Sequence, residues 1–573
     1  MSQASSTRNG PSGAAPATGK KGGNSKAYAL MASGTMVSRG LGFLRTALLT
    51  YAIGALTLAD IFEKANVIPT IIFMLLAGGI FNVVLVPQLI KVSKRADRGS
   101  DYTSRLITLT VVVMGAATIL LTLLAGPIIK ILTLNWSDAE LALGTTFTYW
   151  CMPQVFFYGV YAVVGQVLNA HGRFGAYMWA PVANNVVQLA VIGTFIGLFG
   201  AYDGANRQVE DWTSQQTVLL AGGSTLGIAI QALVLFWPLA RTGLGIRPKF
   251  GWRGMGLRHV GKLAAWTLSA MAIGNISSLM FSRLVSGATA VRAEMSLVAG
   301  ASVQGEVQLN ITQLITVLPH SIFALSLATV LFNEFTKAFH DNRHQEIAPL
   351  LSRGLRSTAV PVVFASIAFI VLAGPLGRIF ASSASTANQT GAAIGQLLVL
   401  TALGLPFKSI SFFLMRVFYA EEDTRTPMII QSVVAVLGVA TAYLLALVVP
   451  MTKIAIVIAL LFGLMNILSA VIAHVLVVRR YGDYGTGEVA DAYIRIGWMS
   501  ALSGVVGAVV LALMGGYNYG FAWDSIGHAV LSIAISGSCM LVVFLVLLRT
   551  ARSPELEEFL GPLARRIPSL RRH

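Results

Sequence analysis

The chain has 573 residues, of which 55% are hydrophobic and only 11% are charged, and its mean hydropathy is +0.72. Soluble globular proteins carry about 25% charged residues, so this composition excludes a soluble domain. Its apolar runs reach about 20 residues, too long for the alternating strands of a membrane barrel, and therefore predict spanning helices. The formal net charge of +17 raises nucleic-acid binding as an alternative, which the placement of the basic residues tests.

The predicted elements begin after an N-terminal tail, residues 1–26, that is rich in Ser, Gly, Ala and Lys and lacks the apolar core of a signal peptide. We expect this tail to be basic, disordered and cytoplasmic. Fourteen apolar segments follow, at 28–54, 60–90, 104–132, 143–170, 174–200, 215–240, 259–286, 304–336, 355–381, 391–420, 426–450, 453–478, 493–517 and 525–548. The predicted fold is an all-α polytopic membrane protein with about fourteen transmembrane helices.

The basic residues indicate the orientation of these segments. If the N-terminus is cytoplasmic, 30 of the 41 Lys and Arg residues fall in the tails and cytoplasmic loops. The outer loops hold only Arg207, Arg292 and Lys453. Cytoplasmic loops are enriched in Lys and Arg, so this asymmetry predicts both termini inside and explains the net charge without nucleic acid.

A weak internal repeat predicts the domain organisation. Ile80-Phe81 in the second segment recurs as Ile322-Phe323 in the eighth, and the motif around Asn169 and Arg173 recurs around Tyr419 and Arg425. Parallel repeats of this kind are typical of transporters, whose halves close around a central site. The predicted units are a tail at 1–26, an N-lobe of six spans at 27–242, a basic cytoplasmic linker at 243–258, a C-lobe of six spans at 259–480, spans 13 and 14 at 481–550 and a basic cytoplasmic tail at 551–573.

Motifs for enzyme chemistry are missing from the sequence. It contains no phosphate-binding Walker loop and no His and Cys cluster at metal-ligand spacing, and Cys151 and Cys539 both lie in apolar runs. We therefore predict a transporter that is not an enzyme, with no metal and no cofactor.

The first segment carries two arginines, Arg39 and Arg45, within its apolar run. A charged side chain at the centre of the bilayer costs at least about 2.5 kcal/mol, so both should face protein or water, where an anionic ligand can reach them. The alternative is that they only bond to neighbouring helix carbonyls. Six residues of helix separate them by about 9 Å and 240°, so they lie at different depths and on different faces.

The second segment combines charges with helix-breaking residues. Asp60, Glu63 and Lys64 cluster near its outer end and are candidate gate or cavity residues; the alternative is that Glu63 and Lys64 only pair with each other or reach the interface. Pro69 and the pair Gly78-Gly79 interrupt the segment further along, a pattern typical of a helix that bends at a gate.

Fewer charges occur in the spans of the second half. Arg283 lies near the outer end of the seventh segment and can snorkel, whereas Lys408 lies near the middle of the tenth, just after an interruption at 404–406. The eighth segment contains a polar run that can line a wet cavity, although its spacing prevents all members from facing one side: Gln308, Asn310, Thr312 and Gln313.

Motifs in both halves resemble the MurJ/MviN family of lipid II flippases, within the multidrug/oligosaccharidyl-lipid/polysaccharide exporter superfamily. The first is Ser38-Arg39-x-Leu41-Gly42-Phe43-x-Arg45, and it is followed by Ala59-Asp60, by Pro69, by Gly79-x-Phe81 and by Val86-Pro87. Further similarity lies at Leu168-Asn169, Ala180-Pro181, Asn184-Asn185, Phe418-Tyr419 and Thr426-Pro427.

The resemblance implies movement of the undecaprenyl-pyrophosphate-linked peptidoglycan precursor to the outer leaflet of a bacterial inner membrane by alternating access. It implies that Arg39 and Arg45 bind the head group, since a guanidinium suits a pair of phosphate oxygens. It also implies that the last two spans form a groove for the lipid tail, and that membrane lipids and cell-wall synthesis or division proteins are partners.

The sequence departs from the family where further cavity charges are expected. Thr46 replaces an acidic residue, Phe73 and Met74 replace a basic pair, and the Asp-Arg of the eighth span falls near Gln313 and Leu314. Lys408 or Arg283 is expected to compensate, or the ligand is held differently. Two other functions stay open: export of another lipid-linked glycan or of drugs, and a non-transporting membrane scaffold for cell-wall enzymes.

Overall fold

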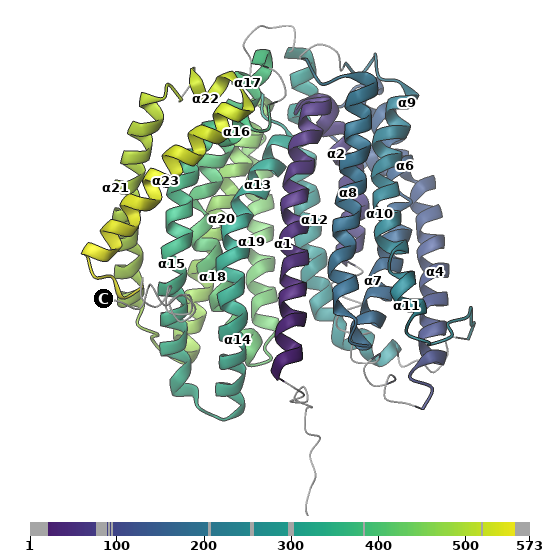
Figure 1. Cartoon of the computed structure of the whole chain (residues 1–573), viewed down its shortest axis with the longest axis horizontal. Coiled ribbons are helices and arrows are strands. Elements are labelled where there is room, and N and C mark those ends of the chain that lie inside the picture. The colour runs from purple at the N-terminus through teal and green to yellow at the C-terminus, as the bar shows by residue number, and fades with distance from the viewer. Residues whose placement is uncertain are drawn as a thin grey trace, which may run out of the picture.

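The architecture comes from a computed structural model, which describes residues 21–75, 89, 92, 96–203, 208–251, 257–295, 303–381, 384–516 and 520–555. All regular elements among these residues are helices, which confirms the predicted all-α class. Figure 1 shows them as two bundles side by side, with most long helices running in the vertical direction of the view.

The N-terminal half contains the helices up to residue 240. They are α1 (Lys21–Ile53), α2 (Thr57–Leu75), α4 (Ser100–Leu123), α5 (Ala125–Leu132), α6 (Asp138–Cys151), α7 (Gln154–Ala170), α8 (Phe174–Phe199), α9 (Ser214–Thr217), the π-helix η2 (Val218–Gly222), α10 (Gly223–Leu233) and α11 (Phe236–Ala240).

The C-terminal half contains the remaining helices. They are α12 (Leu257–Met295), α13 (Glu306–Pro319), the π-helix η3 (His320–Ala324), α14 (Leu325–His340), η4 (His344–Glu346), α15 (Ile347–Val371), α16 (Ala373–Arg378), α17 (Ala384–Leu403), α18 (Leu405–Ala420), α19 (Arg425–Leu445), η5 (Met451–Lys453), α20 (Ile454–Tyr481), α21 (Thr486–Leu513), α22 (Phe521–Asp524) and α23 (Ile526–Thr550).

The described helices account for many membrane spans. Ten are long and apolar enough to cross a bilayer, or eleven if α17 and α18 form one span with a bend of 41°. This bend lies at Gly404, where the sequence predicts an interruption. Each of the fourteen predicted segments contains described helix, including the charged helices α1, α2 and α12 outside that set of eleven. The exact number of fourteen spans stays a prediction.

Several boundaries differ from those expected from the sequence. Helix α1 begins at Lys21, inside the predicted tail, and α12 extends to Met295. The expectation that Arg292 lies in an outer loop is therefore wrong, because the helix continues past the apolar run and buries this side chain against protein. Gly78 and Gly79 lie outside the described residues, as does most of the rest of the second segment beyond Leu75.

Part of the predicted linker is held against α4. The backbone N–H groups of Arg247 and Lys249 donate to the hydroxyls of Ser104 (3.3 Å) and Thr108 (2.9 Å), which lie one turn apart on one face of α4. The Lys249 ammonium also lies 2.8 Å from the Asp101 carboxylate. The segment 244–251 between the two halves is thus ordered by its contacts with α4.

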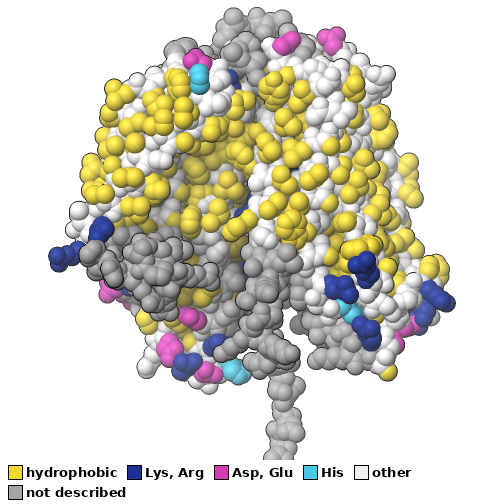
Figure 2. Space-filling view, in the orientation of Figure 1, with side chains coloured by type: hydrophobic (Ala, Val, Ile, Leu, Met, Phe, Trp, Pro, Cys, Tyr) yellow, Lys and Arg dark blue, Asp and Glu magenta, His cyan; other side chains and the backbone are white. Residues whose placement is uncertain are grey.

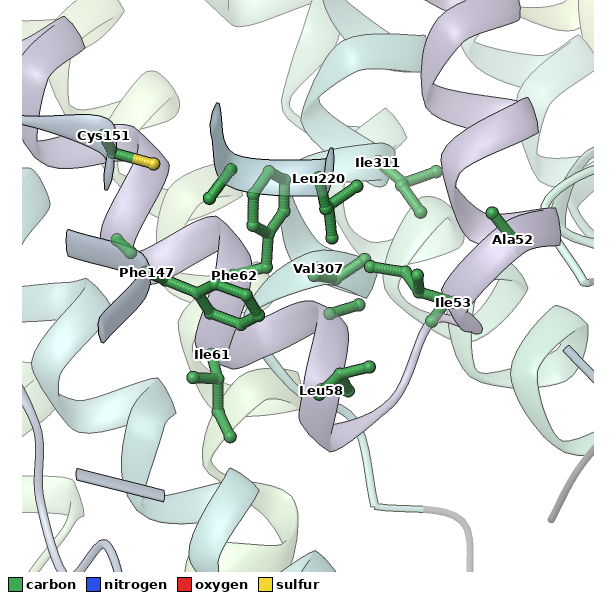
Figure 3. Packing of buried hydrophobic residues seen from close by; sticks show 14 of the residues in the cluster. Ala52, Ile53, Leu58, Ile61, Phe62, Phe147, Cys151, Leu220, Val307 and Ile311 are labelled. Atoms are coloured by element: carbon green, nitrogen blue, oxygen red, sulfur yellow. The ribbon is translucent and has the colours of Figure 1, made fainter. Parts of the chain in front are cut away.

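The two halves meet around the start of α2, which packs on α6 and α7 of its own half and on α12 and α13 of the other. Figure 3 shows the apolar part of this junction, in which Leu58 and Phe62 of α2 lie with Val307 and Ile311 of α13 and with Leu220 of η2. The rings of Phe62 and Phe147 meet edge to face with centroids 5.5 Å apart. This tightly packed apolar layer positions the polar groups beside it.

The last two long helices, α21 and α23, pack on each other and on α15 and α16. They lie at the outer flank of the C-terminal half, in yellow-green and yellow in Figure 1. In Figure 2 hydrophobic side chains cover a broad middle band of the molecule, and most visible Lys and Arg side chains lie toward its lower end. The division into two six-span lobes with two added spans stays a prediction.

Candidate functional site

A cavity of about 220 Å³ lies where the two halves meet, close to the turn between α1 and α2. Its walls come from α1, α2, α8, η2, α10 and α13, so both halves contribute. Of the 18 lining residues only Arg45 and Glu63 are charged, and amide and hydroxyl side chains supply most of the other polar groups.

Arg45 reaches this cavity from α1, about 12 Å before the end of that helix at 1.5 Å per residue. Its guanidinium donates to Gln188 Oε1 on α8 at 3.2 Å, and the Gln188 amide in turn donates to Asn184 Oδ1 at 2.7 Å. No carboxylate lies within 4.0 Å of this guanidinium among the described residues. Arg45 is oriented by a neutral amide and keeps donors free for an anionic ligand.

The opposite wall carries Glu63, which accepts a hydrogen bond from the Asn310 amide of α13 at 3.3 Å. Asn66, one turn further along α2, accepts from Gln154 at 3.0 Å, and Gln154 also donates to Thr225 at 3.2 Å. These bonds fix a polar wall in which every amide has a partner, so the cavity has a defined shape before any ligand enters.

The third wall includes Leu220 of η2 and Ser224 of α10. A π-helix forms its hydrogen bonds between residues five apart instead of four, which widens the helix, and it often occurs at functional sites. Here it follows a capping box in which Thr213 and Gln216 satisfy each other's backbone N–H groups. The local widening of this helix borders the cavity directly.

A buried ion pair closes the junction next to the cavity. The Asp60 carboxylate of α2 accepts from Arg292 Nη1 of α12 at 2.9 Å, from the Thr289 hydroxyl at 2.8 Å and from the Val307 N–H of α13 at 2.7 Å. Arg292 also donates to Gln308 Oε1 at 3.3 Å, and the Gln308 amide donates to the Ala55 carbonyl in the turn between α1 and α2. Asp60 is only 1% exposed, so this network is sealed from solvent.

A second buried pair lies one turn further along α2. The Lys64 ammonium lies 2.6 Å from a Glu306 carboxylate oxygen of α13 and donates to the Ser282 carbonyl of α12 at 2.9 Å. The Ser282 hydroxyl bonds to both charged groups. We call the two ion pairs, Asp60–Arg292 and Lys64–Glu306, together with the contacts of Gln308 to Arg292 and to the Ala55 carbonyl, the α2 closure.

The remaining predicted site residues lie outside the cavity lining. Arg39 is exposed, and no hydrogen bond or ion pair of its side chain is found among the described residues. Lys408 of α18 and Arg283 of α12 are half-buried, and Arg283 Nε has no partner in the part of the chain that the structure describes. Gln313 of α13 is exposed, and Pro69 is buried inside α2. Arg39, Arg45 and Lys408 thus do not converge on this cavity.

The structure corrects one pairing and adds residues that sequence reasoning missed. Glu63 and Lys64 do not pair with each other, since successive residues on a helix point about 100° apart and Lys64 turns to Glu306. Arg292 and Glu306 were missed as site residues. A count of charges could have found them, because Asp60 and Lys64 inside an apolar segment each require a partner of opposite charge.

The departures from the family motifs make the cavity less charged. The family motifs place charged residues at or near the positions of Thr46 and Leu314. Both of these residues line the cavity. Phe73 instead stacks on Tyr158 with ring centroids 4.7 Å apart, and Met74 is exposed. No group of three or more His, Cys, Asp or Glu side chains that could hold a metal occurs among the described residues.

A helical membrane protein whose halves meet around a polar cavity, with a buried closure on one side of it, belongs to the class of alternating-access transporters. The solved structures support this fold. A structure of the lipid II flippase MurJ in an inward closed conformation aligns with a TM-score of 0.66 at 17% identity, covering 91% of this chain and 99% of that one. An inward-facing multidrug MATE transporter of the MOP superfamily aligns with a TM-score of 0.62 at 14% identity, covering 78% of this chain and 96% of that one.

Sequence comparison identifies the family. The family model for the lipid II flippase MurJ matches residues 49–522, so this chain belongs to the lipid II flippase MurJ family. A probable lipid II flippase MurJ of Rhizobium meliloti is 27% identical over 426 residues, covering 73% of this chain and 74% of the relative. That of Synechocystis is 23% identical over 540 residues, covering 92% of this chain and 95% of the relative.

Proposed function

We propose that this chain moves lipid II, the undecaprenyl-pyrophosphate-linked peptidoglycan precursor, across a bacterial plasma membrane and that Arg45 binds an anionic group of its head. The observation that carries this proposal is the arginine without a carboxylate partner in an otherwise nearly uncharged cavity between the two halves. An unpaired guanidinium in such a site is costly without a ligand, and it can take two oxygens of a phosphate at once.

We place the α1–α2 turn on the outer side of the membrane. The support is the asymmetry of the basic residues, since 30 of 41 fall on the side of the N-terminus. With this orientation the α2 closure seals the outer side, and substrate enters the cavity from the cytoplasm. Arg39 lies about 9 Å toward the cytoplasm from Arg45 and is the first of the two to meet a head group.

Translocation then requires the α2 closure to open while the opposite end closes. Opening separates Asp60 from Arg292 and Lys64 from Glu306, so each of these four charges must find water or a new partner. The transmembrane potential can favour outward movement of a diphosphate, since each unit of charge gains about 2.3 kcal/mol per 100 mV. Lys408 and Arg283 of the C-terminal half lie in the described residues without an ion pair, and we propose that one of them meets the ligand in the other conformation.

The test is complementation of a strain depleted of its own flippase. Arg45→Ala should insert in the membrane at the normal level and fail to support growth, and lipid II should accumulate in the inner leaflet. The matched control is Arg416→Ala, another arginine within a span, whose guanidinium stacks on Phe412 at 4.6 Å and lies outside the cavity lining; it should support growth. Full rescue by Arg45→Ala would overturn the assignment.

The same experiment separates the alternatives. An exporter of drugs or of another lipid-linked glycan would share the fold but would not restore growth of the depleted strain. A scaffold for cell-wall enzymes would restore growth with Arg45→Ala and would fail when the cytoplasmic tails and loops are deleted.

A further inference from the structure

The cavity holds two opposite charges that do not neutralise each other directly. Arg45 and Glu63 both line it, yet each is bonded to a neutral amide, Gln188 on one side and Asn310 on the other, and their charged atoms are more than 4.0 Å apart. The amide partners come from different halves of the molecule, α8 and α13. The cavity therefore has a positive pole and a negative pole fixed at separate places.

The other charges around Glu63 are already paired. Asp60 on the same helix lies 2.9 Å from Arg292 of α12, and Lys64 lies 2.6 Å from Glu306 of α13. The thiol of Cys151 on α6 is uncharged and buried, and it contacts the Asn66 amide oxygen at 3.9 Å. Arg45 is thus the one unpaired cation facing Glu63 among the described residues, and Glu63 is the one unpaired acid facing Arg45.

We infer that Glu63 is the binding residue for a primary ammonium group of the transported head group. An anion alone would gain from Arg45 and be repelled by Glu63, whereas a dipolar group gains from both poles. The cavity supplies what an ammonium needs, namely a carboxylate with side-chain amides close by. This inference rests on the proposed function, in which the ligand is lipid II and the amine belongs to its peptide.

The size of the cavity limits which part of the head group occupies it. Pockets for drug-sized ligands measure about 300–1,000 Å³, so a cavity of about 220 Å³ admits only a small part of a disaccharide-peptide. The anion next to the ammonium is a phosphate or a peptide carboxylate, and both would bind a guanidinium through paired oxygens. Glu63 thereby selects for head groups that carry a free amine near an anionic group.

The test measures binding to the purified full-length protein. The ligands are lipid II with a free amine in its peptide and the same lipid II with that amine acetylated. The wild type should bind the free amine about tenfold more tightly, because acetylation removes one charge-assisted hydrogen bond. Glu63→Gln should bind the two ligands equally and should bind the acetylated ligand at least as tightly as the wild type does. The control Glu488→Gln, at an exposed glutamate of α21, should keep the tenfold preference.

The outcomes distinguish failure of the ammonium site from failure of the proposed function. If the wild type binds both ligands equally well and Glu63→Gln changes neither affinity, the ammonium site is wrong and the proposed function stands. If acetylation has no effect but replacing sodium by choline weakens binding to the wild type and not to Glu63→Gln, an inorganic cation occupies Glu63 and the inference is also wrong. If the wild type binds neither ligand, the proposed function itself fails.

Ligands that differ only in the peptide carboxylate identify the anion at Arg45. Loss of affinity on amidation indicates the carboxylate, and an unchanged affinity indicates the phosphate.

Discussion

The α2 closure and the cavity beside it contain similar residues, but the charged side chains are paired in the closure and unpaired in the cavity. In the closure, each acid meets a base within 3 Å, and serine, threonine and backbone groups satisfy the remaining positions. In the cavity, Arg45 and Glu63 are held apart by amides and face open space. The two sites are so close that Val307 contributes to both, since its backbone N–H donates to Asp60 and the residue also lines the cavity.

This difference indicates what each set of charges does. A buried charge is tolerated when it is paired and fully hydrogen-bonded, so the closure can hold the two halves together and release them as a unit. A charge that is oriented but left unpaired costs stability unless a ligand provides its partner. Stability should therefore depend on the closure, and transport should depend on both.

The largest effect is expected for Lys64→Met. It leaves Glu306 buried without a partner, and breaking a buried pair in this way costs about 3–5 kcal/mol. The midpoint of thermal unfolding of the purified protein should fall strongly. The double variant Lys64→Met/Glu306→Leu should recover most of this loss because both charges are gone, and an unrecovered loss would mean that the pair is not the cause.

A smaller effect is expected for Thr289→Val, which removes one donor to Asp60 and keeps the side-chain shape. A hydrogen bond to a charged group contributes about 1.5–3 kcal/mol, and the Thr289 side chain is fully buried. The free energy of unfolding should fall. The closure should also open more often, so a cysteine introduced at Ala55 should be labelled faster. The control Thr194→Val, at an exposed threonine of α8 that bonds only to its own helix, should change neither.

A still smaller effect on stability is expected for Glu63→Gln, since the carboxylate has one weak hydrogen bond and no ion pair. The unfolding free energy should not fall, because the substitution removes a charge that has no ion-pair partner, while the transport rate falls. A loss of several kcal/mol would contradict the distinction between closure and cavity, because it would place Glu63 among the groups that hold the protein together.

The smallest loss of stability is expected for the partly exposed ion pair of Asp423 and Arg480. Burial alone would raise the pKa of Asp423, but hydrogen bonds from Thr426 and Arg480 outweigh it and hold this pKa below its usual range. Its contribution to stability is present above the ordinary pKa of about 3.9 and is lost as the pH falls through the lower pKa of the folded state. Asp423→Asn should cost about 1 kcal/mol or less at pH 7 and should reduce the stability lost on acidification below pH 4, measured by unfolding at both pH values.

The sequence predicted the fold better than the site. Long apolar runs specify spanning helices through composition alone, and Gly404 before Pro406 predicted the bend between α17 and α18. The motif at Arg45 marked a residue that does line the cavity. The partners Arg292 and Glu306 could not be found in this way, because they lie more than 230 residues from Asp60 and Lys64 and only the packing of α2 on α12 and α13 brings them together.

The central claim is that the α2 closure must open for transport. Ala55 and Gln308 touch across it, so a protein with Ala55→Cys and Gln308→Cys and with Cys151 and Cys539 replaced can be joined by a short thiol cross-linker. After reconstitution in vesicles, the cross-linked protein should lose lipid II translocation, and each single-cysteine variant treated with the same reagent should keep it. Translocation at the normal rate by the cross-linked protein would contradict the account.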